Sequence, residues 1–407
     1  MHRARRRTRA LLALMSCSVL AVTACAGGES SGSAPVASKS AEQIVLKVGI
    51  ETGLAASHNP DMGNQMLAAA EGFTKWNNEN DTGVKIEIVD VVNDLSEPGT
   101  AAIGMRNLLQ KGAQAVVGDH SSSTAKVLVP IANEGKAIYT VVGGWADELT
   151  GTDLPYVFRL GTSNNQIAAA GIVPFLKHLH ETEGLERVGI LADQSAFGVG
   201  LLKVLEGASK DGSLPAGVDL HGVTVQVQQT DVTAQLLQLK KKDVQLVLIA
   251  ATSNWRDLAV KQAHQVGVAP AAKILAAWNF PPYPQFWDAN GASGIGVYYV
   301  NVEGSVPPNE QWKLYESIVG DKASIWGAWT WDSMLALQKA ALIAKSGDGT
   351  ALIKAMEQVE VDGATGPIGF HADGEAYHDR KEVVATIRQM QEVGQTEGTL
   401  VYEPSKG

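Results

Sequence analysis

Hydroxyl-bearing residues gather at one point of the chain, where they can bind a polar or acidic group. An apolar run at 115–118 is followed by the residues His120, Ser121, Ser122, Ser123 and Thr124. Serine and threonine side chains cap the N-termini of helices, and the free backbone N–H groups at such a terminus attract anions and hydrogen-bond acceptors. This cluster therefore predicts a binding site for a hydrogen-bond acceptor.

The pattern around the cluster predicts the elements that position it. A helical pattern follows the hydroxyls, and a second apolar run at 137–142 ends in Gly143, Gly144 and Trp145. The whole segment is typical of a strand, a helix and a second parallel strand. Small ligands bind at the carboxyl edge of such sheets, so we expect this segment to form half of a binding cleft.

The motifs of catalysis, metal binding and cofactor binding are absent or lie in the wrong context. A Gly-x-Ser-x-Gly pattern at 28–32 has no strand, turn and helix around it. Gly198 and Gly200 follow a strand-like run but lack the third glycine of a dinucleotide motif. The histidines are scattered singly, and His120 alone lies at the expected site. We therefore expect no enzyme, no cofactor and no metal.

Composition excludes a nucleic-acid partner. The chain has 407 residues, of which 45% are hydrophobic and 19% charged, and its formal net charge is -10. No basic cluster lies beyond the first ten residues, whereas a nucleic-acid surface needs one. The length suggests two to three units of roughly 150 residues each.

The N-terminus has the pattern of an export signal. The basic region contains Arg3, Arg5, Arg6, Arg7 and Arg9. The apolar core at 10–22 is too short for a stable membrane anchor, and the residues 22–25 that follow, Val-Thr-Ala-Cys, resemble a bacterial lipobox. We predict a signal peptide at 1–24, a lipid on Cys25 and a flexible tether at 25–43. The alternative is an ordinary secretory signal with an incidental cysteine.

From residue 44 onward, apolar strand-like runs alternate with helical patterns in two successive groups. The first group covers 44–160, and the second begins at 166 with a predicted helix over 166–180. Parallel sheets covered by helices on both faces produce this alternation. We therefore predict an α/β fold with two Rossmann-like lobes.

The last hundred residues do not fit one lobe simply. Helical patterns cover 312–319 and 326–344, whereas 383–390 and 399–402 have strand patterns. This order indicates that the chain crosses between the lobes more than once.

Several short motifs carry a family resemblance. They are Asn93-Asp94 with Glu97-Pro98 and Ala101, Gly118-x-x-x-Ser122 with Pro130-Ile131, Glu148-Leu149-Thr150, Phe158-Arg159, Asp193 with Phe197-Gly198-x-Gly200, Gln262-Ala263 before Gly267, and Gly366-Pro367-Ile368-Gly369-Phe370 before Asp373-Gly374. In this order, from about residue 44 to 402, the chain resembles the periplasmic binding proteins of the leucine/isoleucine/valine-binding family. These proteins are the substrate receptors of ABC importers.

The resemblance implies a type 1 periplasmic binding protein with three crossings between its lobes. We expect these crossings near Leu160, at 301–304 and at 370–372. The implied boundaries are 44–160 and 304–371 for the N-terminal lobe, and 161–303 and 372–407 for the C-terminal lobe.

Family binding positions fall on particular residues here. The resemblance implies that Ser122 holds a carboxylate, that Phe197 covers the ligand from the second lobe, and that Trp326 contributes from the returning segment. Further ligand positions implied by the resemblance are Gly143, Gly144, Trp145, Thr252, Ser253 and Trp278. Beside these family positions, we expect ligand contacts from His120, Ser121, Ser123 and Asn279.

Two of these positions depart from the family pattern. Trp145 stands where the family has a threonine, and Trp278 stands where a glutamate receives the ammonium of an amino acid. Burying an ammonium without a carboxylate is unfavourable by several kcal/mol, so an ordinary amino acid is a poor ligand. Together with Phe197 and Trp326, these residues predict an aromatic box for a ring, a sugar face or a quaternary ammonium.

The alternative for the tryptophans is that some pack inward as core or hinge contacts. Trp329 and Trp331 lie on the same predicted helix as Trp326, and we expect at least one of them in the core.

The resemblance also implies partners and a location. We expect a monomer that is held by Cys25 on the outer face of the cell membrane and works with an ABC permease and ATPase. The first alternative is a ligand sensor of the same fold that feeds a signalling partner. The second is an exported enzyme.

Overall fold

The computed structural model describes residues 43–55, 60–302 and 309–404. The predicted signal peptide, the lipidation site Cys25 and almost the whole predicted tether lie outside these residues. Among the described residues, no helix combines the length and the apolar character needed to cross a membrane.

The first sheet is parallel throughout and has the strand order β2-β1-β3-β4-β5. Every residue of β3 and β4 is buried, as expected for strands covered on both faces. The elements of this part are β1 (Ile44–Thr52), α1 (Pro60–Glu79), β2 (Val84–Asn93), α2 (Pro98–Gln110), β3 (Ala115–Gly118), α3 (Ser122–Gly135), β4 (Ile138–Val141), the 3-10 helix η1 (Asp147–Leu149) and β5 (Val157–Arg159).

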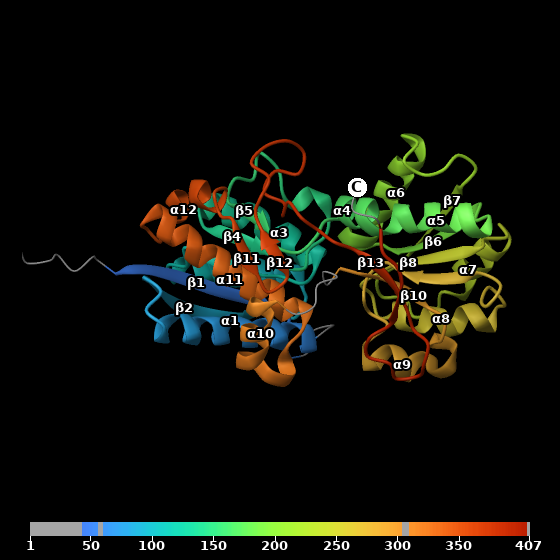
Figure 1. Ribbon diagram of the computed structural model, residues 1–407, viewed down its shortest axis with the longest axis horizontal. Coiled ribbons are helices and arrows are strands. Elements are labelled where there is room, and N and C mark those ends of the chain that lie inside the picture. The colour runs from blue at the N-terminus through green and yellow to red at the C-terminus, as the bar shows by residue number, and fades with distance from the viewer. Residues whose placement is uncertain (1–42, 56–59, 303–308, 405–407) are drawn as a thin grey trace, which may run out of the picture. The chain divides into compact units, whose positions relative to one another are not determined.

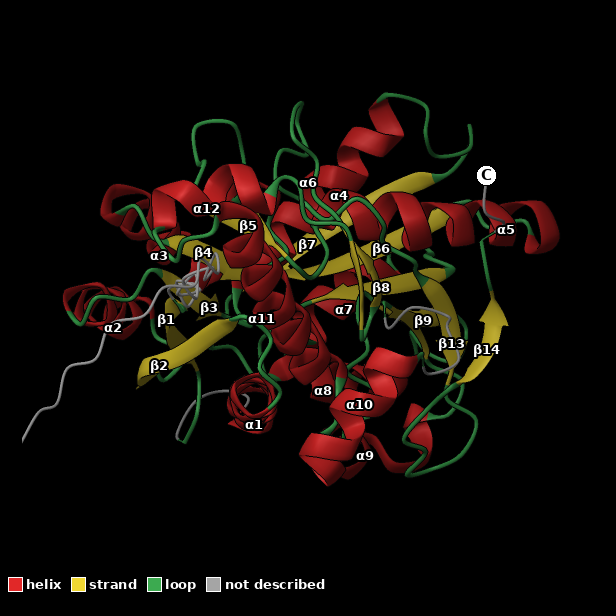
Figure 2. Cartoon of the chain, turned by 60° about the vertical axis from the view of Figure 1, so that its left-hand side comes forward, coloured by secondary structure: helices red, strands yellow, loops and turns green. Residues whose placement is uncertain are grey.

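The second sheet has the order β14-β13-β10-β9-β8-β6-β7. Strand β13 is antiparallel to both of its neighbours, β10 and β14, and all other pairs are parallel. Figure 2 shows helices on both sides of it. Its strands are β6 (Arg187–Asp193), β7 (Asp219–Val225), β8 (Leu246–Ala250), β9 (Lys273–Ala276), β10 (Tyr298–Asn301), β13 (Thr386–Gln389) and β14 (Thr399–Tyr402). Its helices are α4 (Asn164–Ile167), α5 (Val173–Glu183), α6 (Ala196–Lys210), α7 (Thr233–Lys240), α8 (Trp255–Gln265), α9 (Pro284–Asn290) and the 3-10 helix η3 (Gly291–Gly294).

A returning segment joins the first sheet after β10. It contains α10 (Glu310–Val319), the 3-10 helix η4 (Gly320–Lys322), α11 (Ile325–Ala344), α12 (Gly349–Met356) and the hairpin of β11 (Val361–Gly363) with β12 (Gly366–Ile368). Helix α11 packs against α1 and β1 (Figure 1) and is buried on nearly all sides. A helix that is apolar all round belongs in a core. We call the first sheet with this segment the N-terminal lobe, and the second sheet with its helices the C-terminal lobe.

This arrangement confirms the predicted α/β class with two parallel-sheet lobes. The predicted helix over 166–180 is wrong in one respect, because α4 and α5 are separated by one π-helical segment, Ala168–Ile172. Gly171 lies there against Val300 and Ala385. Helices α9 and α12 have no counterpart among the predicted elements, since each is only 7 or 8 residues long and offers about two turns of periodicity.

Candidate ligand-binding cleft

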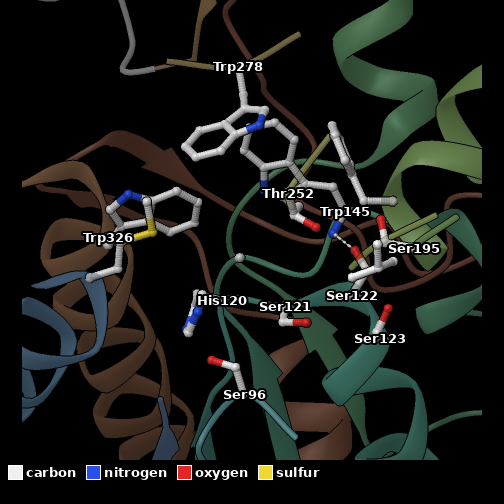
Figure 3. Close-up of a pocket in the computed structure, with 14 residues that line it drawn as sticks. Ser96, His120, Ser121, Ser122, Ser123, Trp145, Ser195, Thr252, Trp278 and Trp326 are labelled. Atoms are coloured by element: carbon white, nitrogen blue, oxygen red, sulfur yellow. Dashed lines mark hydrogen bonds between the residues drawn. The ribbon is translucent and has the colours of Figure 1, made fainter. Parts of the chain in front are cut away.

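A cavity of about 110 Å³ lies between the two lobes, at the carboxyl ends of their strands. An apolar cavity of roughly 150 Å³ takes up benzene, so this one suits a body of about one small ring. Figure 3 shows residues that line it. They are Met62, Ser96, His120, Ser121, Ser122, Ser123, Gly143, Trp145, Ser195, Phe197, Val227, Thr252, Trp278 and Trp326.

The serines at the start of α3 hold the cleft in shape. Ser121 is the N-cap of α3, and its hydroxyl oxygen accepts from the Thr124 N–H at 3.4 Å. The Ser122 oxygen accepts from the backbone N–H groups of Trp145 at 2.9 Å and Ala146 at 3.1 Å. Both oxygens therefore position backbone, while each hydroxyl keeps one hydrogen to donate.

Four aromatic residues line the cavity, and three of them, Trp145, Trp278 and Trp326, are labelled in Figure 3. The Trp145 and Trp326 rings are stacked, with centroids 6.3 Å apart and an interplanar angle of 19°. Phe197 meets Trp145 edge-on at 5.7 Å, and Trp278 meets Trp326 edge-on at 6.2 Å. A Cβ on Gly143 would lie 2.4 Å from the Trp326 ring, so glycine is required there. The rings predicted to form the aromatic box therefore come together at the cavity.

The two tryptophans that follow Trp326 on α11 lie in different surroundings. Trp331 is fully buried and packs edge-on against Phe73 at 4.9 Å, which makes it a core residue. Trp329 does not line the cavity, but its ring contacts Trp145 at 6.2 Å and Trp326 at 5.4 Å. It thus supports the aromatic wall from behind.

The C-terminal lobe forms one wall of the cavity, which we call the C-terminal wall. Its polar groups converge on one buried carboxylate, Asp193. It accepts hydrogen bonds from the backbone N–H and hydroxyl groups of Ser195, Thr252 and Ser253, six in all. A Cβ on Gly198 would lie 2.3 Å from an Asp193 oxygen, which explains why a glycine follows Phe197 in this motif. The wall is therefore fixed by internal hydrogen bonds.

Three of the predicted ligand residues lie outside the lining of this cavity: Gly144, Ser253 and Asn279. The carbonyl of Gly144 accepts from the Arg159 guanidinium at 2.9 Å, and a Cβ there would meet Leu149 rather than the cavity. The Ser253 hydroxyl donates to Asp193 at 2.6 Å, away from a ligand. Asn279 is buried next to Trp278.

The cavity also includes four residues that the sequence analysis did not identify: Met62, Ser96, Ser195 and Val227. Two of them could have been identified from sequence features. Ser96 lies inside the motif at 93–98, and Ser195 caps α6 directly after a strand that ends at Asp193. Met62 and Val227 could not have been identified in this way, because nothing in the local sequence distinguishes them from core residues.

A cluster of buried carboxyl groups lies behind His120. Glu51 is in β1, Asp94 directly follows β2, Asp119 directly follows β3, and each is 0% exposed. Neither oxygen of Glu51 has a hydrogen-bond partner. Burial and the charges of Asp119 and Asp94 raise the pKa of Glu51 from 4.5 to about 9. Burial and Asp119 raise the pKa of Asp94 from 3.8 to about 7.

The cavity lining favours hydrogen-bond acceptors over cations. None of the described lining residues is aspartate or glutamate. The N-termini of α1, α3, α6 and α11 all contribute lining residues, and their dipoles direct positive potential at the cavity. Among the described residues, no group of three or more histidine, cysteine, aspartate or glutamate side chains is arranged to hold a metal ion.

Comparison with known proteins identifies the family. The chain belongs to the periplasmic binding protein family, whose model matches residues 46–394. This family is non-enzymatic, which excludes the exported enzyme considered above. A curated relative, Leu/Ile/Val-binding protein homolog 8 of Brucella abortus, is 24% identical over 206 residues. That match spans about half of each chain, 49% of both.

Solved structures share the fold. A leucine binding protein from Thermotoga maritima has a TM-score of 0.73 at 18% identity, covering 88% of this chain and 98% of its own. A solute binding protein of an ABC transporter from R. palustris, in complex with 4-hydroxybenzoate, has a TM-score of 0.72 at 15% identity, covering 89% of this chain and 99% of its own. The two-lobed fold is thus that of type 1 periplasmic binding proteins.

Proposed function

We propose that this protein is an extracytoplasmic solute-binding lipoprotein that captures a small solute between its lobes and delivers it to an ABC-type permease. The solute has an aromatic or otherwise stackable body and one polar or acidic end. The observation that carries this proposal is a cavity lined by Trp145, Phe197, Trp278 and Trp326 with no carboxylate among its described lining residues.

Branched-chain amino acids do not suit this cavity. Their ammonium group needs an acceptor, preferably a carboxylate, and leaving it unpaired in a buried site is unfavourable by several kcal/mol. Trp278 fills the position at which the family resemblance places that carboxylate. Its indole N–H donates to the Ala251 carbonyl at 2.8 Å, and the Arg256 guanidinium lies 5.0 Å from its ring. This wall favours neutral or anionic solutes.

The R. palustris neighbour that binds 4-hydroxybenzoate supports an aromatic acid as the ligand class. An aryl carboxylate combines a flat body for the tryptophan rings with an acceptor for the helix N-termini and hydroxyl groups. Its single ring also agrees with the cavity of about 110 Å³.

Contacts between the lobes support capture by closure. The Ala196 N–H of α6 donates to the Ser123 hydroxyl at 3.3 Å, and the Trp326 indole N–H donates to the Tyr283 hydroxyl at 2.8 Å. Each pair joins the N-terminal lobe to the C-terminal lobe. A solute that fills the cavity stabilises this closed form relative to an open one, and the closed form is what a permease would receive.

The lipid anchor on Cys25 belongs to the same proposal and rests on the lipobox-like residues 22–25. Mass spectrometry of protein from the native membrane tests it, because a diacylglyceryl group on an N-terminal Cys25 is expected. An unmodified N-terminus after an ordinary signal-peptidase site would contradict it. A sensor role with a signalling partner stays the alternative to transport.

A thermal-shift screen tests the ligand class. The panel contains aromatic acids, sugars, amides, betaines and branched-chain amino acids, and we expect the melting temperature to rise with aromatic acids. Trp145→Ala and Trp278→Ala should each weaken binding of the best hit by about tenfold or more, because aromatic anchors dominate such sites. The control is Trp312→Ala, a tryptophan of α10 that does not line the cavity. Unchanged affinity in both cavity variants would refute the aromatic box.

A further inference from the structure

His120 differs from the other polar side chains of the cavity lining because it can carry a charge. The Ser96 hydroxyl and the Trp145 indole N–H also lack a hydrogen-bond partner, but both stay neutral. The oxygens of Ser121, Ser122 and Ser123 already accept hydrogen bonds from backbone N–H groups. The hydroxyls of Ser195 and Thr252 donate to Asp193. His120 is the one described lining residue that changes charge near neutral pH.

The His120 ring lies next to the Asp119 carboxylate. Its Nδ1 atom lies 3.1 Å from a carboxylate oxygen of Asp119, and the same oxygen accepts the backbone N–H of His120. The ring is nearly buried, with 5% of the side chain exposed, while the Asp119 side chain is 0% exposed. In the view of Figure 3 the ring lies between Trp326 and Ser96. The Nδ1 contact with Asp119 is an ion pair and not a hydrogen bond, and the His120 side chain lines the cavity.

We infer that His120 is the residue of this cleft that discriminates between anionic and neutral solutes, and that Asp119 is its positioning partner. The inference rests on the proposed function, because it assigns a role within the same ligand cavity. A protonated His120 donates a charge-assisted hydrogen bond to an anionic end, which is roughly twice as strong as a neutral one. A neutral isostere of the same shape does not receive that benefit.

The groups around His120 keep it charged. Burial acts to lower the pKa of His120, but the Asp119 carboxylate and Asp94 outweigh burial, and the pKa lies above the ordinary value of 6.5. The charged and titratable groups that face this cluster are Asp119, Asp94 after β2, Glu51 of β1, Tyr139 of β4 and, from the C-terminal lobe, Arg256 of α8.

Together with the titratable groups next to it, His120 should make the binding of an anionic solute weaken as the pH rises. Burial, first of all, raises the pKa of Asp94 to about 7 and that of Glu51 to about 9, so Asp94 loses its proton between pH 6 and pH 8 and Glu51 does so at higher pH. Above its raised pKa, His120 loses its positive charge. The inner wall then becomes negative, and an anionic solute is repelled. Binding of an anion should therefore weaken from pH 6 to pH 8, while binding of a neutral isostere should change little.

Isothermal titration calorimetry with 4-hydroxybenzoate and 4-hydroxybenzamide at pH 6 and pH 8 tests this role. At pH 6 the wild type should bind the acid about tenfold more tightly than the amide, and the ratio should fall at pH 8. His120→Gln should remove the preference and its pH dependence. Asp119→Asn should shift the loss of preference to lower pH. The control is His264→Gln, at the end of α8, which should behave like the wild type.

An acid-to-amide ratio in His120→Gln equal to that of the wild type would overturn the inference, even if both probes bind. A histidine NMR titration of the unliganded protein separates this failure from a failure of the proposed ligand class. If neither probe binds, the aromatic-acid proposal fails, and the titration decides on His120. A midpoint above 6.5 that drops in Asp119→Asn supports the inference, and a midpoint at or below 6.5 overturns it.

Discussion

The two walls of the cleft each contain a buried aspartate at the end of a strand, and the two are treated in opposite ways. Asp193 ends β6 and accepts six hydrogen bonds from the residues beside it. Asp119 follows β3, has one oxygen without a partner, and shares its surroundings with Glu51 and Asp94.

The difference distinguishes a carboxylate that holds the fold from one that affects the charge of the cavity. Six donors stabilise the charge of Asp193 and bind α6 to the loop after β8, so its role is to fix the C-terminal wall. In the N-terminal cluster Asp94 and Asp119 each accept one backbone N–H, whereas Glu51 has no donor, and a buried carboxyl without donors keeps its proton. The comparison teaches that burial alone does not reveal the role of an acid, whereas its hydrogen-bond partners do.

The largest effect is expected from making the same substitution, aspartate to asparagine, at Asp193 and at Asp119. Asp193→Asn places an amide among backbone and hydroxyl donors and should lower the free energy of unfolding by about 3 kcal/mol. Asp119→Asn removes repulsion with Glu51 and Asp94, so stability should change by less than about 1 kcal/mol. Urea unfolding followed by circular dichroism measures both, with the exposed Asp219→Asn as the control.

Equal destabilisation by the two variants would contradict the distinction between the walls. Loss of ligand binding in Asp119→Asn without loss of stability would sharpen it, because the effect would then belong to the charge of the cavity and not to the fold.

A smaller effect concerns the pH dependence of stability. The pKa of Glu51 is raised from 4.5 to about 9 by burial and by Asp119 and Asp94. The folded protein therefore holds this proton over a range in which the unfolded chain has lost it. The stabilisation is fully present below pH 4.5 and is lost as the pH rises to about 9, with a slope of at most ~1.4 kcal/mol per pH unit.

Glu51→Gln should flatten this slope between pH 5 and pH 9, since glutamine has the shape of the protonated acid and no charge. The remaining slope should reflect Asp94 up to about pH 7. Thermal unfolding across the pH range measures it, and Glu206→Gln, an exposed residue of α6, should leave the slope as in the wild type. A steep slope that survives in Glu51→Gln would show that Glu51 ionises normally.

Much of the fold follows from local patterns. The runs at 115–118 and 138–141 are apolar at every position or nearly so, and they form buried parallel strands. The capping residues Ser121 and Ser195 begin helices where the sequence places them. The break between α4 and α5 is less visible in the sequence, because it depends on how Gly171 packs against Val300 of β10 and against Ala385, which directly precedes β13.

The candidate site was only partly predictable. The aromatic residues could be placed because Trp145 and Trp278 stand out against a family pattern. The engagement of the Ser122 oxygen by the Trp145 and Ala146 N–H groups could not, since it requires the bend after β4. Nor does the sequence reveal that Glu51 and Asp94 lie behind His120, because these residues are far apart in the chain and meet only through the order of strands β2, β1 and β3.

The central claim is that this cleft accepts an aromatic acid and rejects a branched-chain amino acid. Titration of the purified wild-type protein with 4-hydroxybenzoate and with L-leucine at pH 6, each in the same calorimeter cell and buffer, tests it most directly. The account predicts saturable binding of one 4-hydroxybenzoate per chain and no saturable heat with leucine. Saturable binding of leucine, at equal or higher affinity than 4-hydroxybenzoate, would contradict it.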